Sequence, residues 1–410
     1  MKILIVGSDL NSLLLAKYIK SQNEEHDIYV TTTDVSAPET FTGLRIREND
    51  VNSIVDFVKY NGIEFTIALS PMAIINGIAD EFKKEEFLIF APYSEAARIT
   101  YFNSIAKKIL YKLKIPTPKF GIFDRENLAI DYIRRSSFPI VVENDFTLME
   151  RESNIYPCFS KAKQGIQQIF ENGNQKIVIE NYIDEQPLYV YFITDGYNAL
   201  PLISLERASG EKYTTITAPS QKVSDDIYGK LLQGAIYPIL DDITKYTDNY
   251  VGIIGLKIKL YKGYFLVHEI YNGFQHYDFQ AFLSMVDEDI LKLFYDVTIG
   301  CLGDDYSYIN LKNNHSYTVA IDKSEITKSE ILEEDFIESY DDKKYIVTAT
   351  GATINSAQEQ LCDYIKTVTT DEIYEQITSQ IKTKELVYWW MIRNLKDNVQ
   401  VVEKLKTKKI

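Results

Sequence analysis

Residues 251–278 read VGIIGLKIKLYKGYFLVHEIYNGFQHYD, and they predict a β-hairpin around which the rest of the chain is organised. Segments 252–260 and 264–271 are apolar or alternating, as strands are, and a short turn with Gly263 joins them. Glu269 places a carboxylate inside the second strand. A buried carboxylate needs a cation or a metal ion nearby, whereas one at a strand end can simply face water, so the strand alone leaves both interpretations open. The polar residues that follow favour a binding site.

The length, charge and cysteine content indicate a multidomain protein of the cytoplasm. A chain of 410 residues is too long for one ordinary core and predicts two or three domains. Its net charge of −15 argues against nucleic acid or an anionic membrane as the main partner. No apolar run approaches the roughly 18–20 residues that span a membrane, and the first run, 3–6, is too short for a signal peptide. Cys158, Cys301 and Cys362 have no metal-ligand spacing, which favours a reducing compartment.

Strands and helices alternate over the first 92 residues, which predicts a small doubly wound α/β domain. Ligands of such sheets bind where the strands end, and the first strand ends at Gly7, Ser8 and Asp9. This turn lacks the further glycines of a phosphate-binding loop, and Asp9 would repel a phosphate. The expected strands are 2–6, 27–32, 65–69 and 87–90, and the expected helices are 10–21, 51–61 and 75–83.

Two further regions follow, one rich in antiparallel strands and one smaller and mixed. A single long helix over 94–113 and a proline-containing connector lead into the first of them. Towards residue 410, Tyr388, Trp389 and Trp390 cluster on an expected helix, which favours a core or partner-packing face over a cofactor site. The other expected strands are 120–123, 139–142, 176–180, 188–193, 317–321 and 345–350, and the other expected helices are 127–135, 160–172, 235–247 and 355–367.

The order and spacing of these segments resemble the ATP-grasp ligases, and among them the phosphoribosylamine–glycine ligase (glycinamide ribonucleotide synthetase) family. The segments that carry the resemblance are MKILIVG (1–7), IEFTIALSPMAIINGIAD (63–80), LIFAPYSEAARIT (88–100), AKKILYKLKIPTPKF (106–120), FPIVV (138–142), KIVIENYID (176–184), HEIYNGF (268–274) and VTATGATINSAQEQ (347–360). Together they extend over nearly the whole chain.

The resemblance implies a fold class that combines α/β and α+β parts. It implies an N-terminal doubly wound pre-ATP-grasp domain over 1–95 and an ATP-grasp domain over 96–312, whose mobile subdomain spans about 117–190. A small C-terminal α+β domain over 313–375 and a helical tail over 376–410 complete the expected organisation.

The resemblance also implies an activity and its site residues. Members of this family use ATP to turn a carboxylate into an acyl phosphate, which an amine then attacks, in a reaction of purine biosynthesis. Metal ions bridge the phosphates and neutralise the developing charge. By role, the residues at the matching positions are Glu180, Asn181 and Tyr182 for the nucleotide, Glu269 and Asn272 for the metal ion, and Gly7 and Ser8 for the substrate.

Several positions depart from the family's pattern. The two phosphate-binding lysines of the family fall at Asn103 and Glu143, and the segment 145–164, where a glycine-rich phosphate loop should lie, contains no glycine. Lys257, Lys259 and Lys212 are candidate replacements for the nucleotide site. Because Lys257 and Lys259 alternate with apolar residues, the sequence favours a solvated strand face for these two instead.

These observations leave two functions open. The first is an ATP-dependent carboxylate–amine ligase with impaired or altered activity, which uses ATP and Mg²⁺ on an amino acid and a phosphorylated amine. The second is a catalytically silent relative without a cofactor, which binds a small molecule or a partner protein. For both we expect a monomer or homodimer whose partners include neither nucleic acid nor a membrane.

Overall fold

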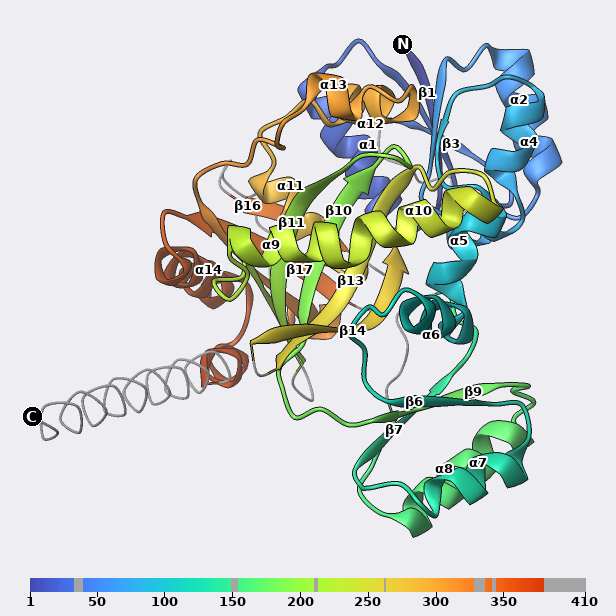
Figure 1. Ribbon diagram of the computed structural model, residues 1–410. Coiled ribbons are helices and arrows are strands. Elements are labelled where there is room, and N and C mark those ends of the chain that lie inside the picture. The colour runs from blue at the N-terminus through green and yellow to red at the C-terminus, as the bar shows by residue number, and fades with distance from the viewer. Residues whose placement is uncertain are drawn as a thin grey trace, which may run out of the picture.

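Three β-sheets organise the computed structural model of the chain (Figure 1). The structure describes residues 1–32, 40–148, 154–209, 213–261, 263–327, 336–340 and 344–379, with the backbone alone for 336–340. Lys212 and the aromatic residues Tyr388, Trp389 and Trp390 lie outside these ranges. Within them, no helix combines the length and the apolar character needed to cross a membrane.

The N-terminal domain is built on a parallel five-stranded sheet in the order β3-β2-β1-β4-β5. Both faces are covered, since Ile3 and Leu14 belong to one core and Leu4 and Ile54 to another. Two short helices replace the single one expected over 75–83, because Gly77 between them is left-handed (φ 82°). The elements are β1 (Lys2–Val6), α1 (Leu10–Gln22), β2 (Asp27–Thr31), β3 (Thr42–Leu44), α2 (Val51–Asn61), β4 (Phe65–Ala68), α3 (Pro71–Ile75), α4 (Ile78–Lys84) and β5 (Ile89–Phe90).

The long helix expected over 94–113 is wrong, because two helices occupy this segment: α5 (Ser94–Tyr101) and α6 (Asn103–Lys112). Phe102 between them has an extended backbone (φ −112°, ψ 108°) and forms a β-bridge with Phe146. The backbone N–H of Asn103 donates to the carbonyl of Asp145 at 2.8 Å. The helix is thus interrupted where another part of the chain supplies backbone partners, and α6 starts beside the small sheet.

A four-stranded antiparallel sheet in the order β6-β9-β7-β8 forms a small lobe, drawn at the bottom of Figure 1. Two helices cover its outer face, and apolar residues such as Ile133, Val142 and Ile166 form a core of their own. The other face is turned towards the rest of the molecule (Figure 1). The elements are β6 (Phe120–Phe123), α7 (Glu126–Ile133), β7 (Ile140–Asn144), β8 (Asn154–Tyr156), α8 (Phe159–Glu171) and β9 (Ile177–Asn181).

The largest sheet has eight antiparallel strands in the order β14-β13-β10-β11-β12-β15-β17-β16. It contains the predicted hairpin, formed by β13 (Gly252–Tyr261) and β14 (Tyr264–Asn272). Strand β12 pairs with β15, so one sheet extends across the expected boundary at residue 312. The parallel N-terminal sheet and the antiparallel sheets confirm the fold class. The remaining strands are β10 (Leu188–Thr194), β11 (Ala199–Ser209), β12 (Thr214–Ala218), β15 (His315–Asp322), β16 (Phe336–Tyr340) and β17 (Lys344–Gly351).

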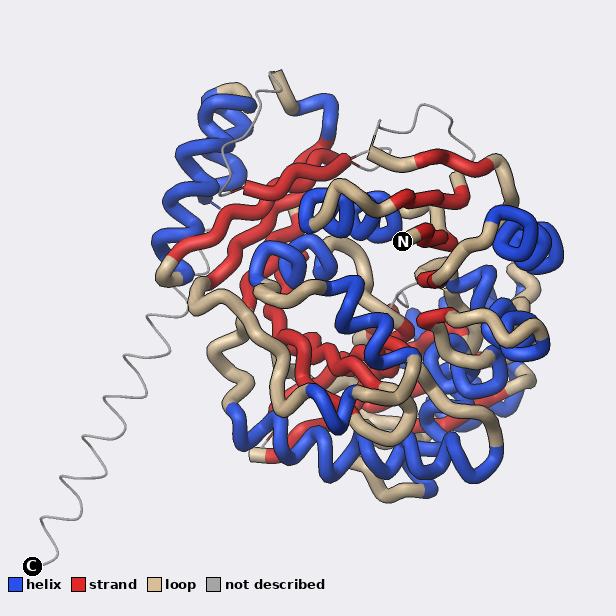
Figure 2. The backbone as a smooth tube through the Cα atoms, turned by 90° about the horizontal axis from the view of Figure 1, so that it is seen from above, coloured by secondary structure: helices blue, strands red, loops and turns tan. Residues whose placement is uncertain are grey.

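Helices pack on both faces of this large sheet. Seen from above, its strands form a curved band with helix α14 beside one end (Figure 2). Leu256 and Ile270 of the hairpin pack with Ile239 on one face, while Tyr191 and Phe282 belong to a core on the other face. The helices are α9 (Asp225–Leu231), a π-helical turn (Leu232–Ile236), α10 (Tyr237–Tyr246), α11 (Asp278–Met285), α12 (Ile290–Thr298), α13 (Leu302–Asp305), a 3-10 turn (Lys323–Glu325) and α14 (Ile354–Val368).

Candidate functional site

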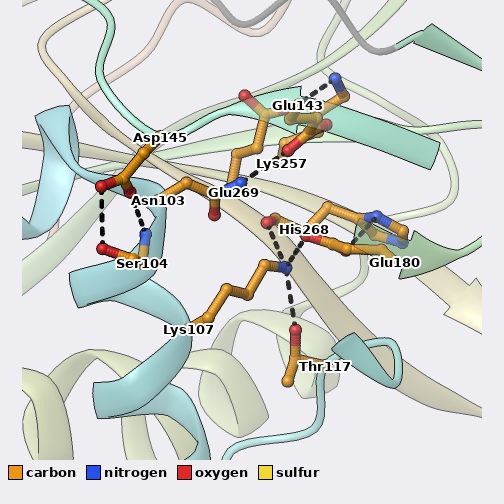
Figure 3. A network of polar contacts seen from close by, with 10 residues as sticks. All are labelled: Asn103, Ser104, Lys107, Thr117, Glu143, Asp145, Glu180, Lys257, His268 and Glu269. Atoms are coloured by element: carbon orange, nitrogen blue, oxygen red, sulfur yellow. Dashed lines mark hydrogen bonds and ion pairs between the residues drawn. The ribbon is translucent and has the colours of Figure 1, made fainter. Parts of the chain in front are cut away.

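Charged side chains from five elements meet between the small sheet and the β13–β14 hairpin (Figure 3). We call this group the charged cluster. Its members are Lys107 of α6, Glu143 of β7, Glu180 of β9, Lys257 of β13, and His268 and Glu269 of β14. The structure thus brings together three residues that the sequence singled out: Glu180, Lys257 and Glu269.

Lys107 and Glu180 form a buried ion pair at 2.7 Å, with side chains that are 0% and 3% exposed. The ammonium group also donates to Thr117 Oγ1 at 3.1 Å and to the carbonyl of His268 at 2.8 Å. The carboxylate expected to accept from an adenine amino group therefore already has a cationic partner. Sequence reasoning missed Lys107, because the residues that bury it come from distant parts of the chain.

Lys257 and Glu269 form a second ion pair at 2.7 Å, and they face each other directly in the β13–β14 register. Lys259, two residues further along the same face, donates to the carbonyl of Ile183 at 2.7 Å. The expectation of a solvated strand face is therefore wrong for both lysines. The chain that leaves β9 covers this face, and the Lys257 side chain is only 12% exposed.

His268 lies among these charges. Burial, reinforced by the nearby ammonium groups of Lys107, Lys259 and Lys257, lowers the pKa of His268 to about 2. The imidazole is therefore neutral at physiological pH, and its Nδ1 lies 3.9 Å from Glu180 Oε2. Its Nε2 is buried and has no hydrogen-bond partner in the described part of the chain.

Asn103 and Glu143, the two positions where the family carries lysines, contact each other. Asn103 Nδ2 donates to Glu143 Oε2 at 2.7 Å, and both side chains are buried. Next to them, the backbone N–H of Ser104 donates to Asp145 Oδ1 at 2.6 Å. Two departures from the family's pattern therefore form one structural contact, which joins the start of α6 to the end of β7.

Asn272 does not lie beside Glu269. The register places Asn272 opposite Ile254 and Glu269 opposite Lys257, so the two side chains project from opposite faces of β14. Asn272 Oδ1 instead accepts from the hydroxyl of Tyr250 at 2.7 Å. No group of three or more His, Cys, Asp or Glu in the described ranges is arranged to hold a metal ion. Glu269 therefore stands without the second metal ligand that the sequence suggested.

The expected hinge residues follow β9 directly. The backbone N–H of Asn181 donates to the carbonyl of Lys119 at 2.9 Å. The Tyr182 ring lies 5.2 Å from the Lys259 ammonium group, and its hydroxyl donates to Asp184 Oδ1 at 3.2 Å. Both residues therefore border the charged cluster, as a nucleotide-binding hinge would, and their role stays a prediction.

The expected substrate turn lies at a different place in the molecule. Ser8 lines a cavity of about 670 Å³ between the N-terminal sheet and the end of β14, and Asn272 lines the same cavity. Gly7 precedes it, and a Cβ there would lie 2.0 Å from Ser12 Oγ, so a larger residue would require the Ser12 side chain to move. The predicted residues are thus divided between the charged cluster and this cavity.

Two family models match the chain over most of its length. The phosphoribosylglycinamide synthetase N domain matches residues 1–100, and the ATP-grasp (A) domain of the same synthetase matches residues 103–272. The chain belongs to the phosphoribosylglycinamide synthetase family. This confirms the resemblance seen in the sequence, and it covers both the N-terminal sheet and the charged cluster.

Sequence relatives in this family are distant. A phosphoribosylamine–glycine ligase of Fusobacterium nucleatum is 25% identical over 309 residues, which is 72% of this chain and 72% of that protein. The ligase of Caldanaerobacter subterraneus is 22% identical over 307 residues, 72% of this chain and 74% of its own.

Solved structures agree with the family fold. The phosphoribosylamine–glycine ligase of Thermotoga maritima superposes with a TM-score of 0.71 at 14% identity, over 88% of this chain and 95% of that one. A biotin carboxylase of Campylobacter jejuni superposes with a TM-score of 0.68 at 15% identity, over 88% and 90% of the two chains. At such low identity these likenesses define the fold alone.

Proposed function

We propose that the chain is an ATP-dependent carboxylate–amine ligase of this family with a rearranged nucleotide site. The observation that carries the proposal is the position of two lysines in the charged cluster: Lys107 donates to the carbonyl of His268 at 2.8 Å, and Lys257 pairs with the adjacent Glu269 at 2.7 Å. Polyphosphate binding requires a concentration of positive charge, which the family supplies from the positions of Asn103 and Glu143. Here α6 and β13 supply it from other positions.

Two of the lysines pair with carboxylates. A bound nucleotide would take the place of these carboxylates at the ammonium groups. Lys107 pairs with Glu180 and Lys257 with Glu269, both at 2.7 Å. When phosphate oxygens take over the ammonium groups, Glu180 becomes available for the adenine amino group. Each charge-assisted hydrogen bond is worth about 1.5–3 kcal/mol, or roughly tenfold to a hundredfold in affinity.

Glu269 is the residue that would hold Mg²⁺ in this proposal. Magnesium is commonly bound by only one or two carboxylates together with substrate phosphates and water, so a single carboxylate is sufficient. The bound ion would supply positive charge that neutralises the phosphates. Glu269 is 1% exposed at its side chain, so the ion could reach it only after Lys257 had moved to a phosphate.

Calorimetric titration of the full chain with ATP, with and without Mg²⁺, tests the proposal. We expect magnesium-dependent binding that Lys257→Met weakens by roughly tenfold to a hundredfold, because one phosphate contact is lost. Lys230→Met is the matched control, since Lys230 forms an exposed ion pair with Asp226 on α9. The absence of both heat and thermal stabilisation at millimolar ATP would rule the proposal out.

The variant Glu269→Gln distinguishes the contribution of the metal ion to ATP binding from that of the nucleotide alone. The amide keeps the size of the side chain but removes the charge, so we expect the enhancement of ATP binding by Mg²⁺ to disappear while metal-free binding remains. If Mg²⁺ still enhanced ATP binding to this variant, Glu269 would not be the metal ligand.

The second candidate is a silent relative that binds a small molecule or partner without ATP. It is favoured by the contact between Asn103 and Glu143, which places a carboxylate where the family has a lysine. The ATP titration decides between the two candidates. Under the first one, ADP release with glycine and phosphoribosylamine is the assay that follows. Cytoplasmic location and a monomeric or homodimeric state stay predictions.

A further inference from the structure

A β-bulge in the hairpin turns His268 towards the charged cluster. Val267 and Glu269 pair with two consecutive residues of β13, so β14 carries one extra residue, His268, between them. Val267 and Ile270 pack in the same apolar core on one face of the sheet. Residues three apart lie on opposite faces of a regular strand, so the bulge is what turns both His268 and Glu269 to the other face.

The bulge is held by contacts from outside the hairpin. Lys107 Nζ of α6 donates to the carbonyl of His268 at 2.8 Å, and the backbone N–H of Val267 donates to the carbonyl of Pro116 at 2.8 Å. Because β14 is the edge strand of the large sheet, these contacts take the place of a further strand. The position of His268 is therefore determined by α6 and by the connector that follows it, as well as by the hairpin.

The imidazole of His268 has one open acceptor. Its Nδ1 faces Glu180 Oε2 at 3.9 Å (Figure 3), and because a carboxylate can only accept, the proton belongs on Nδ1. Nε2 then carries the lone pair. This nitrogen is buried and has no hydrogen-bond partner within the described ranges. A buried acceptor without a donor is unfavourable, so a ligand that supplies a donor here gains affinity.

The charges around His268 favour a neutral donor over a cationic one. Lys107 donates to its carbonyl, and Lys257 pairs with the adjacent Glu269. These ammonium groups help to keep the imidazole neutral, with a pKa of about 2, and they would likewise repel a cationic donor. An amino group on an aromatic base is an uncharged donor, whereas a ring carbonyl oxygen is an acceptor and would meet the lone pair of Nε2.

We propose that His268 determines the base specificity of the nucleotide site, by accepting through Nε2 from the amino group of adenine. A purine with a carbonyl oxygen at C6 places an acceptor against an acceptor and is rejected. This inference rests on the proposed function for the presence of a nucleotide, and it concerns the base alone. Neither the phosphates nor the metal ion takes part in the selection.

Calorimetric titration of the full chain with adenosine and with inosine, without Mg²⁺, tests the role of His268. The two nucleosides differ only at the C6–N1 edge of the base, and neither has a phosphate. We expect adenosine to bind roughly tenfold to a hundredfold more tightly than inosine, because only adenosine gives the buried acceptor its donor. His268→Leu removes this acceptor and should bring the ratio of the two dissociation constants close to one.

His315→Leu is the matched control. His315 begins β15, and its Nδ1 is also buried without a partner in the part of the chain that the structure describes. It does not belong to the charged cluster, so this variant should keep the ratio of the unchanged chain. A change in packing alone would weaken the binding of both nucleosides to the same degree, so the ratio reports recognition of the base and not folding.

Four other results would overturn the role of His268: no binding of adenosine, equal affinity for the two nucleosides, a preference that survives in His268→Leu, and a preference that is lost in His315→Leu as well. The ligase proposal fails separately. ATP binding without a preference for adenosine leaves that proposal intact. Selective adenosine binding without ATP binding leaves the role of His268 intact and favours the second candidate function.

Discussion

The carboxylates of the charged cluster and the carboxylate of Asp9 in the cavity differ in burial and in pairing. In the cluster, Glu180 and Glu269 are buried and each has a lysine at 2.7 Å. In the cavity, Asp9 is exposed and keeps one oxygen without a partner. A ligand of the cluster must therefore displace an existing partner, whereas a ligand of the cavity meets an acceptor that is already open.

This difference has an energetic consequence. Removing one member of a buried ion pair leaves an uncompensated charge in a medium that solvates it poorly, which is strongly destabilising. Neutralising a charge that is exposed to a cavity has a small effect on folding, because water already solvates it. Substitutions should thus affect stability in the cluster and ligand binding in the cavity.

The largest effect on folding stability is expected for Lys107→Met. It leaves the Glu180 carboxylate buried without its ammonium partner, and we expect the free energy of unfolding in urea to fall by about 3–5 kcal/mol. Lys230→Met, which breaks an exposed pair, should cost about 0–1 kcal/mol. Adding Glu180→Gln to Lys107→Met should recover much of the loss. A loss in Lys107→Met no larger than in the control would show that water reaches Glu180.

A smaller loss of folding stability is expected for Lys257→Met. The Lys257 side chain is 12% exposed, so some water can replace the ammonium group at Glu269. We expect a decrease of about 1.5–3 kcal/mol in the same unfolding measurement, the usual value for a hydrogen bond to a charged group. An equal loss for Lys107→Met and Lys257→Met would mean that the two pairs do not differ in solvent access.

The smallest effect on stability is expected for Asp9→Asn, and it is a gain where the lysine variants show a loss. Although the Asp9 side chain is exposed, the protein around the cavity displaces part of the water near its carboxylate, and this desolvation, with a contribution from Glu48, raises the pKa of Asp9. The ionised carboxylate therefore destabilises the folded state above the folded pKa, and stability is regained as the pH falls through that pKa. At neutral pH the variant should be more stable, by less than about 1 kcal/mol because the exposed carboxylate is screened by solvent.

In the same urea unfolding measurement, Asp50→Asn should change stability in the opposite direction. Hydrogen bonds from Ser53 lower the pKa of Asp50, so its ionised form stabilises the folded state, and this contribution is lost as the pH falls through the folded pKa. The variant should therefore be less stable at neutral pH. If both asparagine variants shifted stability in the same direction, the contrast between the two carboxylates would be wrong.

Lys107 shows why part of the site could not be predicted from the sequence. It lies in the segment AKKILYK, where three lysines and several apolar residues predict an amphipathic helix whose lysines face water. Its side chain is 0% exposed because residues from the small sheet and the hairpin surround it. The break at Phe102 has the same origin, since its β-bridge partner Phe146 is 44 residues away. Contacts at such separations leave no periodic signal.

The sequence by itself determined the hairpin, the parallel N-terminal domain and the common face of Lys257 and Lys259, because these follow from local periodicity and turn chemistry. It also placed Glu180 at the end of β9. Only the tertiary structure decided that this face is covered and that Lys257 pairs with Glu269. A strand's period of two determines which side chains share a face, but burial of that face depends on the chain that packs against it.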